Sequence, residues 1–323
     1  MNKPHSTLQE PPSTRHNLSS TLQLLRLPFS FFLMPVYWFA LSQVVDRSWG
    51  RAVLIFIILH LFVYPASNGY NSYMDRDEGP IGGLAHPLQP TRQLFWVTLV
   101  MDGVALALGC IIGPWFVAGL VVYIGASRAY SYRGIRLKQW PFAGWLTVIS
   151  CQGALVFFIV YQGSHPAAAG LADAAGLATA TAAAGGATVA SLHAPVEAMI
   201  ACSLLLGGFY PLTQIYQHDA DRRDGVRTLS MVLGYRGSFV FTGVLYGIAF
   251  LVLGHYLLLS YLEPKEFLVL ATCMLPVIVY FLIWAVKVWR DPAQANYSNT
   301  MRMNLLASVC TNAGFIAVLV MGS

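Results

Sequence analysis

The sequence predicts an all-α, polytopic membrane protein built as a bundle of nine transmembrane helices. Of its 323 residues, 56% are hydrophobic and only 10% are charged, whereas an average soluble domain carries about 25% charged residues. The mean hydropathy is +0.59, and apolar stretches near the ~20 residues that cross a bilayer recur along the chain. A soluble enzyme, a disulfide-stapled secreted domain and a disordered chain are therefore excluded, and the long uninterrupted runs favour helices over a membrane barrel.

The expected spans are apolar runs that lack Lys, Arg and Glu. They cover residues 27–45, 52–67, 94–113, 114–127, 144–162, 196–213, 238–261, 266–286 and 303–321. Two of them, 52–67 and 114–127, are short, so we expect their helices to continue into the polar segments 68–74 and 128–132. Asp102 lies inside the third span without a motif around it and receives no role.

The basic residues orient this bundle. If the N-terminus is cytoplasmic, 16 of the 19 Lys and Arg residues fall on the cytoplasmic side, namely Lys3, Arg15, Arg26, Arg76, Arg92, Arg128, Arg133, Arg136, Lys138, Arg222, Arg223, Arg227, Arg236, Lys287, Arg290 and Arg302. Only Arg47, Arg51 and Lys265 lie outside. Because cytoplasmic loops carry an excess of basic residues, we expect an integral protein of a bacterial inner (cell) membrane, with its N-terminus in the cytoplasm and its C-terminus outside.

The polar parts of the chain complete the predicted organisation. Residues 1–21 are expected to form a flexible cytoplasmic tail that lacks the apolar core of a cleavable signal, and residues 22–323 to form a single membrane domain. Within that domain, the Ala-, Gly- and Thr-rich tract 163–195 reads as a low-complexity outer loop. The five cysteines have no CxxC spacing, so neither a zinc site nor a disulfide framework is indicated.

The acidic residues are unevenly distributed. The chain has fourteen Asp and Glu residues, and six of them lie in two short segments, 68–79 and 214–228, at the cytoplasmic ends of the second and sixth spans. These six are Asp75, Asp77, Glu78, Asp219, Asp221 and Asp224. Glu78, Asp219 and Asp224 also suit ordinary surface charge on a solvated loop.

Helical spacing groups these polar side chains on two faces. Asn71 and Asp75 are four residues apart, and Gln214, Gln217 and Asp221 follow one another at steps of three and four, so each set shares one side of a helix. Two carboxylates 4 Å apart repel by about 4 kcal/mol at an effective dielectric near 20, and a bound cation removes that cost. Oxygen ligands without Cys or clustered His favour Mg²⁺, which proteins hold with one or two carboxylates and substrate phosphates.

Basic side chains lie between the fourth and fifth spans, on the same side of the membrane. They are Arg128, Arg133, Arg136 and Lys138. Guanidinium groups match phosphate oxygens in bidentate geometry, so these residues are candidates for holding a diphosphate. Alternatively, they only mark topology beside anionic lipid headgroups.

Together these features resemble the UbiA superfamily of intramembrane prenyltransferases, over essentially the whole chain. Its first motif, NDxxDxxxD, is matched at Asn71 and Asp75 and departs at Ser72 and Gly79. Its second, DxxDxxxDxxxGxxTLxxxLG, has Gln214 and Gln217 at the first two Asp positions, and the matching positions are Asp221, Gly225, Thr228, Leu229, Leu233 and Gly234. Arg26-Leu-Pro28, Tyr130-Ser131 and Arg136-Leu-Lys138 also look like family positions.

The resemblance implies a Mg²⁺-dependent enzyme with a central cavity open to the cytoplasmic face. Such an enzyme transfers a prenyl group from a prenyl diphosphate to an aromatic, quinone-precursor or other lipid acceptor, with membrane lipid around it and no nucleic acid involved. Asp75 and Asp221 are then the catalytic residues, and the metal ligands are Asn71, Asp75, Asp77 and Asp221. The expected diphosphate-binding set is Arg128, Arg133, Arg136 and Lys138, with Gln217 as a neutral ligand or hydrogen-bonding partner.

Two other functions remain open on the sequence. A terpene cyclase of the same superfamily captures the allylic cation intramolecularly and needs the prenyl diphosphate alone. A transporter or non-catalytic scaffold would place polar residues along a permeation path, but here the acids gather at one face. Tyr70, Tyr73, Tyr130, Tyr210 and Tyr216 are candidate cation-stabilising rings, although packing explains each of them equally well.

Overall fold

The computed structural model describes residues 14–166, 195–261 and 264–322. Every element in these ranges is helical, and no strand is assigned there. Eight helical stretches are long and apolar enough to cross a membrane: Asn17–Ser42, Trp49–Asp75, Arg92–Ile112, Pro141–Ser164, Val196–Arg223, Leu229–Leu258, Lys265–Arg290 and Tyr297–Met321. The expected fourth span coincides with a further helix, α6 (Pro114–Ser131). The predicted all-helical membrane fold is confirmed.

The first half of the bundle is built from broken helices. It comprises α1 (Thr14–Leu24), η1 (Leu27–Leu33), α2 (Met34–Ser42), α3 (Trp49–Ile57), η2 (Ile58–Val63), α4 (Tyr64–Asp75), α5 (Arg92–Ile112), α6, η3 (Leu137–Gln139), α7 (Pro141–Val148), η4 (Ile149–Leu155) and α8 (Val156–Ser164). The second half comprises α10 (Val196–Gln214), η7 (Ile215–Gln217), α11 (His218–Arg223), α12 (Leu229–Tyr261), α13 (Lys265–Arg290), η8 (Pro292–Gln294) and α14 (Tyr297–Met321).

Both short spans extend as expected. The second continues without interruption from α3 to Asp75, and the fourth ends at Ser131. Pro65 sits in the second span, where its missing N–H and its ring disrupt α-helical bonding. The preceding turn, η2, widens into a π-helix, which is how a long helix absorbs such a disruption.

Two boundaries differ from the expectation. Helix α1 begins at Thr14, inside the segment expected to be a flexible tail, and Ser20 there is buried with its Oγ donating to the Gln89 carbonyl at 2.6 Å. This tertiary contact orders a polar stretch whose composition suggests a tail. Helix α12 starts at Leu229 instead of residue 238 and bends at Gly234, whose φ of 67° suits glycine. Most of the loop expected at 163–195, and residues 1–13, lie outside the described residues.

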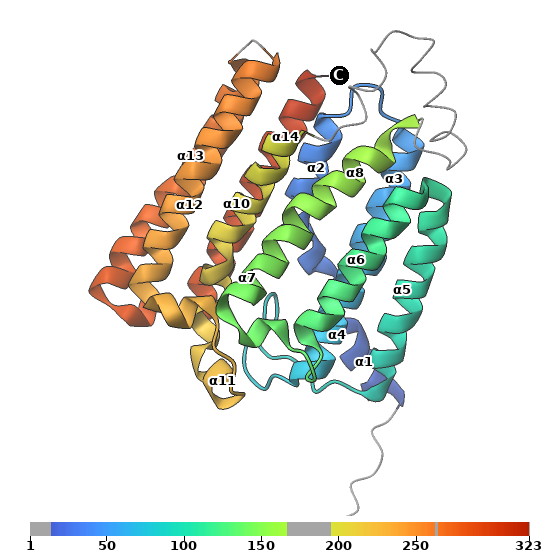
Figure 1. Ribbon diagram of the computed structural model, residues 1–323. Coiled ribbons are helices and arrows are strands. Elements are labelled where there is room, and N and C mark those ends of the chain that lie inside the picture. The colour runs from blue at the N-terminus through green and yellow to red at the C-terminus, as the bar shows by residue number, and fades with distance from the viewer. Residues whose placement is uncertain (1–13, 167–194, 262–263, 323) are drawn as a thin grey trace, which may run out of the picture.

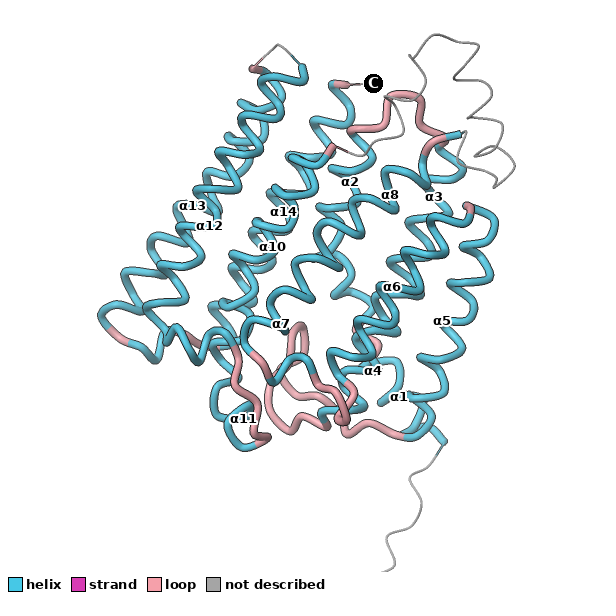
Figure 2. Tube along the Cα trace, in the orientation of Figure 1, coloured by secondary structure: helices cyan, strands magenta, loops and turns pink. Residues whose placement is uncertain are grey.

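The helices run side by side, and the two ends of the bundle differ (Figure 1). The C-terminus lies at one end, whereas α1, α4 and α11 lie at the other (Figure 1). Figure 2 shows loop segments gathered at the end of α4 and α11. The core near the opposite end contains stacked rings, with the centroids of Phe39 and Phe315 4.5 Å apart. The loop-rich end is therefore where both acidic segments meet.

Candidate active site

The two acidic segments face one cavity at the loop-rich end, which we call the mouth cavity. It has a volume of about 170 Å³. Among the residues that line it are Arg26, Asn71, Asp75, Asp77, Lys138, Gln214, Gln217 and Asp221. The structure thus brings together four predicted metal ligands, one predicted basic residue and Gln217, which lie up to 150 positions apart in the sequence.

Helix α4 places Asn71 and Asp75 on its cavity side. The Asn71 amide nitrogen donates to Ser131 Oγ at 3.0 Å, which leaves the amide oxygen for the cavity. Asp75 is the last residue of α4, and the chain turns sharply after it because Arg76 adopts the left-handed conformation with φ 57°. The Asp75 carboxylate forms an ion pair with Lys138 and approaches Arg136 at 3.7 Å.

The other two carboxylates lack such partners. Asp221 Oδ2 is buried and makes no hydrogen bond among the described residues. For Asp77, burial and the neighbouring Asp75 carboxylate raise the pKa to about 6. An unpaired buried carboxylate is costly, so both groups call for a cation.

This donor set fits Mg²⁺. In the described part of the chain, no three His, Cys, Asp or Glu side chains are grouped tightly enough to hold a metal by themselves. Mg²⁺, however, is usually held by one or two carboxylates with waters and substrate phosphates. Asp77 and Asp221 would supply the carboxylates, and the Asn71 and Gln217 side chains, which line the same cavity, offer neutral oxygens.

The two glutamines are already engaged in the fold. Gln217 Nε2 donates to the Pro80 carbonyl at 3.3 Å, and Gln214 Oε1 accepts from the Ser230 amide at 3.5 Å. Gln214 is buried, and Ser230 Oγ also lies 2.8 Å from His218 Nε2. Gln214 therefore ties α10 to the start of α12 where the family motif has an Asp.

Arg26 is a site residue that the sequence did not place in the diphosphate-binding set. It lies between α1 and η1 with φ 48° and lines the mouth cavity. Its guanidinium donates to the carbonyls of Gly82 at 3.1 Å and Asn68 at 3.3 Å, while its Nε is buried without a partner. The sequence did indicate this residue through Arg26-Leu-Pro28 at the start of the first span. Burying a basic side chain at that position is unfavourable unless an anion lies close to it.

The loop after α6 forms a bridge between the two acidic segments. Arg136, with φ 50°, forms an ion pair with Asp224, which follows α11, and also faces Asp75. Arg133 is half-exposed and donates to the Met74 carbonyl at 2.8 Å. On the sequence, Asp224 could equally be a solvated surface residue. In the structure it holds the basic loop over the site.

Arg128 lies apart from these basic residues. It is not among the residues that line the mouth cavity, and it forms an ion pair with Asp102 of α5. Its guanidinium carbon lies 4.0 Å from the centre of the Tyr70 ring. The structure therefore gives Asp102 a partner and places Arg128 in the wall between α4, α5 and α6.

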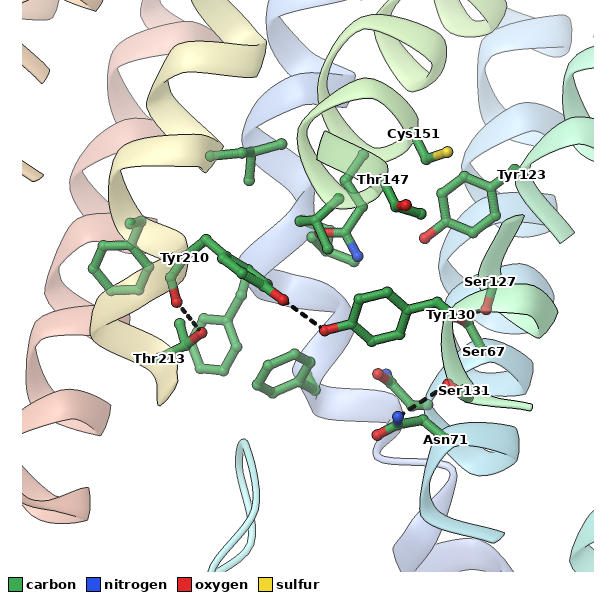
Figure 3. A pocket seen from close by; sticks show the side chains of 18 of the residues that line it. Ser67, Asn71, Tyr123, Ser127, Tyr130, Ser131, Thr147, Cys151, Tyr210 and Thr213 are labelled. Carbon is green, nitrogen blue, oxygen red and sulfur yellow. Dashed lines mark hydrogen bonds between the residues drawn. The ribbon is translucent and has the colours of Figure 1, made fainter. Parts of the chain in front are cut away.

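A second cavity, the inner cavity, adjoins the mouth cavity and has a volume of about 240 Å³. The hydroxyls of Tyr130 on α6 and Tyr210 on α10 lie 2.7 Å apart and line both cavities (Figure 3). The described residues that line the inner cavity include no Asp, Glu, Lys, Arg or His. A charged mouth thus opens into an uncharged cavity, and the tyrosine pair lies at the junction.

Such a site suits a ligand with an anionic head and an apolar body, held by a membrane bundle. Residues 31–306 match the model of the UbiA prenyltransferase family. The chain belongs to this family, which confirms the resemblance seen in the sequence.

Individual relatives support the same fold. The chain is 26% identical over 227 residues to the bacteriochlorophyll synthase 33 kDa chain of Cereibacter sphaeroides, and the match covers 66% of each chain, just under two thirds of that relative. A UbiA homologue from Archaeoglobus fulgidus, solved with GPP and Mg²⁺, is 20% identical, with a TM-score of 0.61 over 93% of this chain and 99% of its own. The apo structure of a UbiA homologue from Aeropyrum pernix K1 is 16% identical, with a TM-score of 0.62 over 90% and 98%.

Proposed function

We propose that this protein is a Mg²⁺-dependent intramembrane prenyltransferase that transfers a prenyl group from a prenyl diphosphate to a hydrophobic acceptor. One observation carries the proposal: Asp77 and Asp221 come from distant segments, form no ion pair among the described residues, and line one cavity with Arg26 and Lys138. This cavity lies directly beside an uncharged one. The A. fulgidus homologue was solved with GPP and Mg²⁺, which is the ligand pair that this arrangement suits.

In this proposal the mouth cavity holds the diphosphate. Arg26 and Lys138 contact its oxygens, and Lys138 exchanges its ion pair with Asp75 for phosphate. Asp75, Asp77 and Asp221, with Asn71 and Gln217 nearby, would hold Mg²⁺, whose positive charge would offset the charge that builds on the leaving diphosphate. Arg136 and Arg133 keep the basic loop closed over the site, and Arg128 has a structural role in the wall.

The reaction then takes place beside Tyr130 and Tyr210. The bond between prenyl C1 and oxygen breaks, and the diphosphate keeps the electron pair. The acceptor forms a new bond to C1 and loses a proton, which passes to the released diphosphate. Because the inner cavity excludes charged side chains, the electron-rich ring faces nearby are the groups that stabilise the allylic cation.

We further infer that the mouth faces the cytoplasm. Arg26, Arg133, Arg136 and Lys138 lie at that end, and cytoplasmic segments carry the excess of basic residues. A bacterial inner membrane suits this orientation. The charge bias of the sequence supports it, with the N-terminus cytoplasmic and the C-terminus outside.

The test compares two aspartates on one short helix. Asp221→Asn should abolish Mg²⁺-dependent release of diphosphate from a radiolabelled prenyl diphosphate, because it removes a proposed metal ligand. Asp219→Asn is the matched control: its side chain is 89% exposed and pairs only with Arg222, so turnover should persist. Asp75→Ala should abolish turnover as well. Unchanged turnover in Asp221→Asn would sink the proposal, and a cyclic product formed without any acceptor would identify a terpene cyclase instead.

A further inference from the structure

The inner cavity has two chemically different walls. The apolar wall comes from Phe29 and Phe32 of η1 with Leu206 and Phe209 of α10. The polar wall comes from α4, α6 and the helix that contains η4, and its side chains are Ser67, Asn68, Asn71, Ser127, Ser131, Thr147 and Gln152. In Figure 3, the labelled side chains of α4 and α6 lie on the side opposite Tyr210 and Thr213 of α10.

The apolar wall continues away from the mouth. A side pocket of about 70 Å³ shares Phe32, Leu206, Phe209 and Asn304 with the inner cavity. Its lining is mainly apolar, although Asn304, Ser308 and Thr311 of α14 also contribute to it. An isoprenoid chain attached to a diphosphate in the mouth therefore has a mainly apolar path along η1 and α10. The polar wall is left for a different molecule.

Neutral hydrogen-bonding groups hold the polar wall together. Ser67 and Ser127 are hydrogen-bonded to each other, and the Asn71 amide nitrogen donates to Ser131 Oγ. Gln152 lies in the π-helical segment η4, and such segments are frequent at functional sites. A glutamine amide has two donor hydrogens and an acceptor oxygen, so Gln152 retains hydrogen-bonding capacity for a ligand.

Charge and size then restrict that ligand. The described lining contains no basic side chain, so a carboxylate entering the cavity would be buried without a partner, which costs far more than burying a hydrogen-bonded hydroxyl. At about 240 Å³, the cavity is smaller than the roughly 300–1,000 Å³ of sites for drug-sized ligands. This volume favours a ring-sized acceptor over a macrocycle.

We propose that the acceptor is an uncharged, ring-sized molecule with hydroxyl or carbonyl groups, bound to the polar wall through Gln152 while the prenyl chain follows the apolar wall. This inference rests on the proposed prenyl transfer, because it assigns the second substrate of the same site. It excludes acceptors whose ring carries a carboxylate into the cavity.

The test uses two probes that differ by one carboxylate group, 2-naphthol and 6-hydroxy-2-naphthoate. Their binding to the detergent-solubilised full chain is measured by equilibrium dialysis at pH 7, without prenyl diphosphate. The naphthol should bind at least about tenfold more tightly, because the carboxylate pays the unpaired burial cost. Equal affinity, or tighter binding of the carboxylate, would overturn the proposal.

Variants then locate the contact. Gln152→Leu should weaken naphthol binding about fivefold through the loss of one hydrogen bond, while Gln93→Leu, at an exposed position of α5, should not change it. Gln152→Arg should improve carboxylate binding relative to naphthol, since it supplies the missing cation. An unchanged naphthol affinity in Gln152→Leu would refute the role of Gln152. If Gln152→Arg does not fold, the two probes measured on the natural chain still show whether the cavity prefers a neutral or a negatively charged acceptor.

A separate measurement distinguishes this proposal from the proposed function. Binding of a radiolabelled prenyl diphosphate to the natural chain, with and without Mg²⁺, reports on the mouth alone. If it does not bind, prenyl transfer fails regardless of the naphthol result. If it binds and is transferred only to carboxylated rings, transfer stands and the acceptor proposal is refuted.

Discussion

Asp102 and Arg128 form an ion pair inside the membrane region, and its removal should destabilise the fold strongly. The two side chains are only 11% and 18% exposed, and Arg128 also lies over the Tyr70 ring and within 3.5 Å of the Thr98 carbonyl oxygen. Asp102→Ala leaves the guanidinium without its counter-ion in a setting with little water. An uncompensated buried charge costs about 3–5 kcal/mol, whereas the cation–π contact that remains recovers at most about 2 kcal/mol.

The measurement is a double-mutant cycle on unfolding. For a chain of this size, a loss of 3–5 kcal/mol lowers Tm by about 4–7 °C. Asp102→Ala should show that loss in detergent, and the double variant Asp102→Ala, Arg128→Met should recover much of it, because no charge is left buried. Asp219→Ala breaks an exposed ion pair and should change stability by less than about 1 kcal/mol.

Two outcomes would refute this reasoning. One is a stability loss in Asp102→Ala no larger than that of the Asp219 control. The other is a double variant as unstable as the sum of the single ones. The same proteins test the placement of Arg128 in the wall. Prenyl diphosphate should bind the double variant as it binds the natural chain, since Arg128 does not line the mouth cavity.

Three further perturbations have defined outcomes. Asp224→Asn removes a carboxylate that forms an ion pair with Arg136 and holds the basic loop over the site. Prenyl diphosphate affinity should therefore fall several-fold in a binding assay, while Tm changes little. A Tm loss like that of Asp102→Ala would contradict this prediction. Because the pKa of Asp77 is raised to about 6, this carboxyl holds its proton until the pH exceeds that value. Mg²⁺ binding at pH 6 should therefore release about half a proton from Asp77, in addition to the proton that Asp221 gives up, and Mg²⁺ affinity should fall at lower pH. Calorimetry in two buffers of different ionisation enthalpy measures this release, and equal heats would exclude it. A Cβ at Gly153 would lie 2.7 Å from the backbone of α10, whereas Gly103 on α5 has open space around it. Gly153→Ala should therefore lower the free energy of unfolding by about 1–3 kcal/mol, and Gly103→Ala should not lower it. Equal effects of the two substitutions would refute the close approach of α10 to Gly153.

Hydropathy and charge were sufficient to predict the spans because each depends on local composition. The helices of the two short spans extend into polar sequence as predicted, since a bilayer sets a minimum length. Helix α1 was not predicted, because its order depends on the contact between Ser20 and the Gln89 carbonyl, 69 positions away. Composition carries no information about such a contact.

The site residues also fall into those that local sequence predicts and those that depend on distant contacts. Asn71, Asp75 and Asp221 were predictable from spacing on a helix and from the family motifs. Asp224 was not, because it differs from a solvated acid through its ion pairs with Arg136, 88 positions away, and with Arg133. Asp102 carried a usable signal: a carboxylate inside a span requires a partner, and Arg128, 26 positions later, supplies it.

The placement of charge also has a chemical consequence for the proposed reaction. An allylic cation reacts with any nearby nucleophile, so a carboxylate in the inner cavity would capture it as an ester, and a mobile ammonium or guanidinium would destabilise it. The described lining of that cavity has neither. Asp102 and Arg128, which lie in the wall beside Ser67 and Ser127, neutralise each other. The carboxylates lie on the mouth side of Tyr130 and Tyr210. There they would bind the metal ion that accompanies the diphosphate, and so would not face the cation. The structure therefore separates the charges needed to ionise the substrate from the uncharged space in which its cation would persist long enough to meet an acceptor.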